Sequence, residues 1–177
     1  MSESPREPTE SSDDALSHVD PAHFLRSFLV VAFHYVALFF GLLMGMMLIA
    51  WLGFPEVFQL WALQGKELED FQHAWDSKPE LLFPTGLCIW MVVLSTVLSI
   101  LIGATTAYWA PFSRGGHGIF LAIISICTYL QISMTQPQIP KWMMLAMLIL
   151  SPTMIVLTSN FVDRWMARRA YDEEESM

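Results

Sequence analysis

Residues 27–52 read SFLVVAFHYVALFFGLLMGMMLIAWL and contain no charged side chain; the nearest charges are Arg26 before this stretch and Glu56 after it. As an α-helix the stretch is about 39 Å long, at roughly 1.5 Å per residue. The hydrocarbon core of a bilayer is only about 30 Å thick. We therefore interpret residues 27–52 as a transmembrane helix, and the rest of the chain follows the same pattern.

Three further uncharged runs predict three more transmembrane helices, at residues 84–110, 119–136 and 142–162. The glycine-rich segment 111–118, PFSRGGHG, predicts a turn between the second and third helices. Pro152 lies within the last run, where it removes one backbone hydrogen bond and is expected to bend the helix. The expected fold is therefore all-α, an integral membrane protein with four transmembrane helices.

The composition agrees with a membrane protein and argues against binding to nucleic acid. Hydrophobic residues make up 54% of the 177 residues and charged residues 15%, and the net charge is −8. Phosphate binding requires a basic surface, so an acidic chain is a poor nucleic-acid partner. Cys88 and Cys127 both lie in apolar runs, so we expect neither a disulfide framework nor a zinc site. The expected partners are the lipid bilayer, other membrane subunits or a second copy of the chain, and no cofactor is expected.

The chain divides into a membrane domain, residues 23–165, and two charged tails. The acidic tail 1–22 is expected to be disordered because it has too few large apolar groups to form a core. It resembles neither a secretory signal nor a mitochondrial presequence, so the first helix is expected to be a retained anchor. The tail 166–177 is charged.

The connection between the first two helices predicts an amphipathic helix on the extra-cytoplasmic membrane surface. This connection, residues 53–83, is charged, with acidic side chains in excess over basic ones. Its apolar residues recur mostly at three- and four-residue steps, which is typical of one apolar helix face. The apolar positions are Val57, Leu60, Trp61, Leu68, Phe71 and Trp75.

The distribution of basic residues predicts that both termini are cytoplasmic. Four transmembrane helices place the two ends of the chain on one side of the membrane. The arginines next to the predicted helices lie on that side, and they outnumber the lysines on the other. An excess of basic residues marks the cytoplasmic face. We expect a multi-pass protein of the cell, or inner, membrane.

Two stripes of small residues mark helix faces suited to close packing. Small residues at every fourth position allow two helix backbones to approach closely. We expect the stripes to pack the first two helices against each other within the chain, with self-association as the alternative. The stripes are Ala37, Gly41 and Gly45 in the first helix, and Ser95, Ser99, Gly103 and Ala107 in the second.

His34 is the main candidate for an intramembrane polar site. An imidazole at this depth must be neutral or paired, because a bare charge is costly in hydrocarbon. The expected topology places Ser125 of the third helix at a similar depth. Three interpretations stay open: His34 bonds to a Ser or Thr and holds helices together, it relays protons, or it ligates a haem. The haem would need a second histidine, and His23 and His117 lie at the membrane surface rather than at the depth of His34.

No catalytic motif of the GxSxG, HExxH, P-loop, GxGxxG or EF-hand type occurs in the sequence. Glu69, Asp70 and His73 have the helical spacing of metal ligands, but an exposed charged face explains them equally. We therefore expect a non-enzymatic scaffold or accessory subunit of a membrane complex. The alternatives are a small carrier or proton-conducting oligomer that uses His34, and a haem-bearing anchor for electron transfer.

Overall fold

The computed structural model describes residues 21–62, 82–110, 113–136 and 138–175, and the regular structure of this part is entirely helical. Four of its helices are long and apolar enough to cross a membrane. This confirms the predicted all-α class and the four candidate membrane helices. The long helices are α1 (Pro21–Gly53), α5 (Thr85–Trp109), α6 (Arg114–Thr135) and α7 (Lys141–Glu175), and a short helix, α2 (Pro55–Ala62), follows α1.

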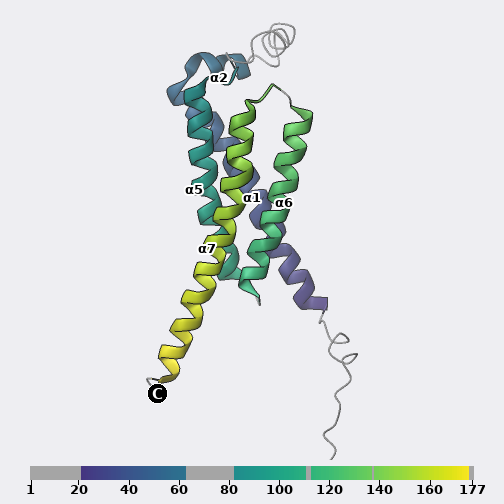
Figure 1. Ribbon diagram of the computed structural model, residues 1–177, viewed down its shortest axis with the longest axis vertical. Helices are drawn as coiled ribbons and strands as arrows, with labels where there is room; N and C mark the ends of the chain where they lie inside the picture. The colour runs from purple at the N-terminus through teal and green to yellow at the C-terminus, as the bar shows by residue number, and fades with distance from the viewer. Residues whose placement is uncertain (1–20, 63–81, 111–112, 137, 176–177) are drawn as a thin grey trace, which may run out of the picture.

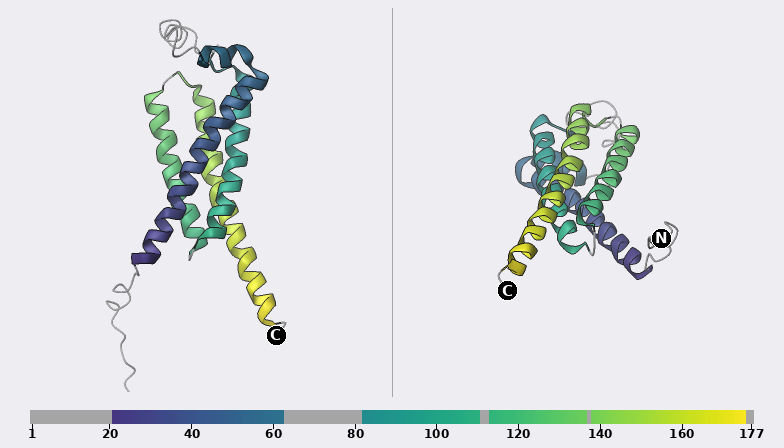
Figure 2. Two further views of the ribbon diagram at one scale, coloured as in Figure 1. Left: turned by 180° about the vertical axis from the view of Figure 1, so that it is seen from behind. Right: turned by 60° about the horizontal axis from the view of Figure 1, so that its bottom comes forward.

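The long helices form a bundle in which α7 packs along both α5 and α6, while α1 crosses obliquely and packs mainly against α5 (Figures 1 and 2). The first residues of α1 and the last residues of α7 lie at the same end of the bundle (Figure 1). Helix α2 lies at the opposite end (Figure 1). The bundle is thus a tight group of α5, α6 and α7, with α1 leaning across one side.

The helices differ from the predicted spans chiefly at their ends. α1 begins at Pro21, within the predicted tail, and the rest of that tail lies outside the described residues. α7 continues through the predicted charged tail to Glu175. Its exposed last turns contain an i,i+4 ion pair, with Arg169 Nε 3.4 Å from Glu173 Oε1, a spacing that supports helix formation in solvent. Residues 166–175 of the predicted charged tail therefore continue the last helix.

Only residues 114–118 of the segment predicted as a turn are helical: they form the first turn of α6, which begins at Arg114, and residues 111–112 lie outside the described residues. The physical reason is close packing against α7. A Cβ atom added at Gly115 would lie 2.7 Å from Asn160 Oδ1, and one at Gly118 would collide with Ser159. These glycines let the start of α6 approach the backbone of α7, so they serve helix packing rather than chain reversal.

The predicted surface helix of residues 53–83 is described only in its first part. α2 buries Val57 against Ala50 and Leu87, which joins it to the ends of α1 and α5. Residues 63–81 of the prediction lie outside the described residues.

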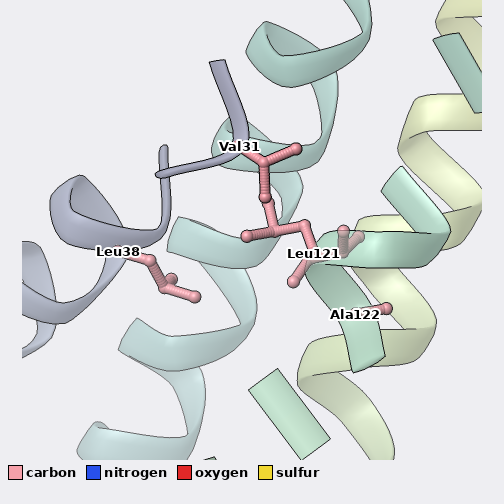
Figure 3. Packing of buried hydrophobic residues seen from close by; sticks show 5 residues of the cluster. Val31, Leu38, Leu121 and Ala122 are labelled. Atoms are coloured by element: carbon pink, nitrogen blue, oxygen red, sulfur yellow. The ribbon is translucent and has the colours of Figure 1, made fainter. Parts of the chain in front are cut away.

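The hydrophobic core follows the helix interfaces rather than a single centre. In one cluster the side chain of Val31 from α1 reaches toward Leu121 from α6, with Leu38, Ala122 and Ile155 beside them (Figure 3). Large apolar side chains also cover the outside, among them Phe33 at 71% exposed and Met134 at 84% exposed. An outer surface this apolar is typical of a bundle surrounded by lipid.

Candidate functional site

A chain of four hydroxyl groups connects α5, α6 and α7 inside the bundle. Ser95 Oγ lies 3.0 Å from Tyr129 Oη, and Tyr129 donates to Ser151 Oγ at 3.4 Å. Ser151 Oγ lies 2.5 Å from Ser99 Oγ. All four side chains are buried. Without water, each buried hydroxyl needs a protein partner, so this chain fixes the three helices relative to one another.

The stripe on α5 places Ser99 against Ser151 of α7 and Ser95 against Tyr129 of α6. Ser95, Ser99, Gly103 and Ala107 are all buried, because residues four apart share one helix face. Gly103 meets Ile155 of α7 so closely that an added Cβ would lie 2.7 Å from its carbonyl oxygen. The closest approach in this part of the bundle is thus between α5 and α7.

The stripe on α1 lies at a different interface. A Cβ added at Gly41 would lie 3.3 Å from Leu98, and one at Gly45 would lie 2.5 Å from Leu94, both on α5. Ala37 is half-buried. The glycines of α1 therefore receive leucine side chains of α5, while Ser99 and Gly103 of α5 contact α7. The two stripes do not meet each other.

His34 is buried, and its Nδ1–H donates to the Val30 carbonyl of its own helix at 2.7 Å. Its ring contacts Phe33 edge to face, with centroids 5.6 Å apart. Within the described part of the chain, no Ser or Thr hydroxyl hydrogen-bonds His34. Ser125 of α6 is also buried and lines a cavity, but the two residues are not joined by a hydrogen bond. His117, in the first turn of α6, likewise donates from Nδ1 to the carbonyl of Ser113, at 3.0 Å.

The interior also contains an apolar cavity of about 210 Å³ walled by all four long helices. It lies in the half of the bundle nearer α2. α1 contributes residues between Tyr35 and Met46, and α6 contributes residues between Ser125 and Ile132. Methionines 143, 144 and 147 of α7 form the opposite wall.

Two tyrosines at this site were not singled out from the sequence. Tyr129 is central to the hydroxyl chain, and Tyr35 bonds to Thr128 at 2.8 Å, which ties α1 to α6. A usable signal was present, because a tyrosine in the middle of an apolar span needs a hydrogen-bond partner for its hydroxyl. The sequence could not tell which helix supplies that partner.

Among the residues that the structure describes, no group of three or more His, Cys, Asp or Glu side chains comes together. The predicted weak metal candidates Glu69, Asp70 and His73 lie outside those residues. The sequence matches no protein-family model, and no curated protein or solved structure is significantly similar to it.

Proposed function

We propose that this chain is a non-enzymatic membrane protein that acts as a scaffold or accessory subunit of a larger complex. The observation that supports this most directly is the extension of α7. This helix has 35 residues, or about 52 Å at roughly 1.5 Å per residue. A bilayer core is only about 30 Å thick, so a long part of α7 projects beyond it. Figure 1 shows this part continuing past the bundle.

The projecting part of α7 has the chemistry of a docking element. Arg164, Arg168 and Arg169 come first, and acidic residues 172–175 follow. Arg169 pairs with Glu173, and its guanidinium lies 5.7 Å from the centroid of the Trp165 ring. A preformed helix presents these charges in a fixed arrangement, which lowers the entropy cost of binding a partner of complementary charge. The arginines next to the bundle also suit the anionic head groups of a cytoplasmic leaflet, so we place both termini in the cytoplasm.

The interior supports a structural role for its polar groups. The hydroxyls of Ser95, Ser99, Tyr129 and Ser151 bond to one another, and His34 bonds to its own helix. The bonds between the four hydroxyls hold α5, α6 and α7 in register in the absence of water, whereas the His34 bond stays within α1. These bonds favour a rigid bundle over a path that carries protons or substrates.

Native mass spectrometry after extraction in a mild detergent tests the proposal. We expect the full chain to be found with a bound protein partner or as a defined oligomer. Arg169→Glu should reduce that association, because it reverses a charge on the projecting helix. Lys141→Glu makes the same charge change at the opposite end of the bundle and should leave the association intact. A wild-type chain that is a clean monomer would overturn the proposal.

A further inference from the structure

The cavity of about 210 Å³ between the four long helices has the properties of a lipid-chain site. We propose that it binds one acyl chain of a membrane phospholipid. This goes beyond the proposed scaffold function, because it concerns the interior of the bundle and not the projecting part of α7.

The residues that line the cavity favour a hydrocarbon ligand. Leucines and methionines form most of this lining, and its few hydroxyl-bearing side chains are largely engaged elsewhere. Tyr35 bonds to Thr128, and Tyr129 bonds to Ser95 and Ser151. A polar ring or head group would therefore find almost no available partner there. Water is also excluded, since an apolar cavity of this kind stays dry while admitting apolar molecules.

The proposed entrance lies between α1 and α6. α1 packs loosely on α6, and the backbones of the two helices diverge toward the end that carries α2 (Figure 2). The lining residues of these two helices fall between Tyr35 and Met46 and between Ser125 and Ile132, within candidate membrane-spanning segments. A molecule entering between α1 and α6 therefore comes from the hydrocarbon phase of the bilayer, which consists of acyl chains.

The size of the cavity excludes a helix from a second copy of the chain. A helix with its side chains is about 10–12 Å across, too wide for this volume. An engineered apolar cavity of about 150 Å³ already holds benzene, so about 210 Å³ is ample for a segment of a hydrocarbon chain.

The methionines in the wall suit a chain of variable shape. Met46, Met91 and Met143 approach the cavity from α1, α5 and α7, and Met144 and Met147 extend the α7 wall. Methionine side chains are unbranched and flexible, so they adapt to chains with different lengths and double-bond positions. The site thus binds acyl chains in general and not the chain of one particular lipid.

Photo-crosslinking tests the proposal. The full chain is reconstituted in phosphatidylcholine vesicles that contain a phosphatidylcholine with a diazirine on one acyl chain, and labelled residues are mapped by mass spectrometry. Met143 and Met147 are only 1% and 5% exposed, so lipid on the outer surface reaches them poorly. We expect both to be labelled, because a chain inside the cavity touches them.

Two tryptophan substitutions on α1 provide the variant and its matched control. Met46→Trp places an indole in the cavity and should reduce labelling of Met143 and Met147 about tenfold or more, because it takes the space of several methylene groups. Met44 is 65% exposed on the lipid side, so Met44→Trp should leave the labelling unchanged. Leu42→Trp, at a partly buried residue that lines the cavity, and Leu48→Trp, at an exposed residue, repeat the comparison if Met46→Trp does not fold.

The outcomes are distinct. Absence of label at Met143 and Met147, or unchanged label in both cavity variants, would overturn the proposal. A long-chain isoprenoid alcohol can be added at a level that leaves surface labelling intact. If it abolishes the labelling of Met143 and Met147, the cavity binds an isoprenoid, and the proposal of a phospholipid acyl chain is overturned. Neither result depends on whether a protein partner binds α7, so failure here is distinguishable from failure of the scaffold proposal.

Discussion

Ser159 Oγ on α7 donates a hydrogen bond of 2.9 Å to the carbonyl oxygen of Gly103 on α5. This bond is possible only because Gly103 has no side chain, which lets the two backbones approach. It lies along the same helix pair as the contact between Ser99 and Ser151. The α5–α7 interface is therefore the most closely packed part of the bundle, and substitutions there should have the largest effect on stability.

Gly103→Ala should destabilise the bundle by about 1–3 kcal/mol, the usual cost of overpacking. The new Cβ would lie 2.7 Å from the Ile155 carbonyl oxygen and 2.9 Å from Ile155 Cα, and backbone atoms cannot move aside cheaply. Unfolding in mixed micelles by titration with a denaturing detergent measures the change. Gly53→Ala is the control, since nothing lies within 4 Å of a Cβ at that position. Equal stability of both variants would contradict the close α5–α7 approach.

Gly45→Ala should cost less than Gly103→Ala, although Gly45 belongs to the GxxxG pattern. Its Cβ would meet the Leu94 methyl groups, which are the far end of a flexible side chain. A rotamer adjustment of that leucine costs about 0.5–1.5 kcal/mol. The same detergent titration ranks the two variants. A larger loss for Gly45→Ala would mean that α1, and not α7, makes the decisive helix contact with α5.

Tyr129→Phe should destabilise the bundle by about 0.6–1.7 kcal/mol, the range measured for hydrogen bonds between membrane helices. The change removes the hydroxyl that joins Ser95 to Ser151 while keeping the aromatic ring in place. Tyr108 is exposed, so Tyr108→Phe is the matched control and should have little effect. In a double-mutant cycle, Ser95→Ala should add little once Tyr129 is Phe. Fully additive losses would argue against a direct bond.

His34→Ala should leave proton flux unchanged in liposomes at any pH tested. The Nδ1 proton of His34 is held by the Val30 carbonyl, and no hydroxyl continues a relay from it among the described side chains. A pH-sensitive dye inside the liposomes measures the flux. A clear loss of flux in the variant would establish the proton-conducting alternative. A visible spectrum of the wild-type protein checks the haem alternative in the same preparation, and we expect no Soret band.

Tags at the two ends of the chain should report the same face of the membrane. The start of α1 and the end of α7 lie at one end of the bundle, and four crossings return the chain to its starting side (Figure 1). Protease protection of each tag in sealed vesicles measures this. One protected and one accessible tag would contradict four crossings.

The sequence predicted the long helices well, but it did not predict which helices contact each other. Residues 27–52 and the later uncharged runs predicted the four long helices, because the cost of burying charge and unpaired backbone in lipid acts on each segment by itself. The helix ends were less predictable. α7 continues to Glu175 because its last turns are rich in good helix formers, Ala, Arg and Glu, and contain the Arg169–Glu173 pair.

The glycine-rich start of α6 shows a second limit of prediction from the sequence. Its composition favours a turn, yet Gly115 and Gly118 are helical because α7 passes close beside them. Local preference alone predicts the turn, and packing against a distant segment reverses it.

The amino-acid sequence by itself determined the class of the protein, its membrane environment and the positions of its small and polar residues. The tertiary structure decided which of these residues contact each other. It placed Ser99 and Gly103 of α5 against α7, leucines of α5 against the glycines of α1, Tyr129 between two serines, and a methionine-lined cavity between four helices. The physical reason is that lipid solvation acts on each helix separately, whereas hydrogen bonds and close packing depend on which helices lie side by side.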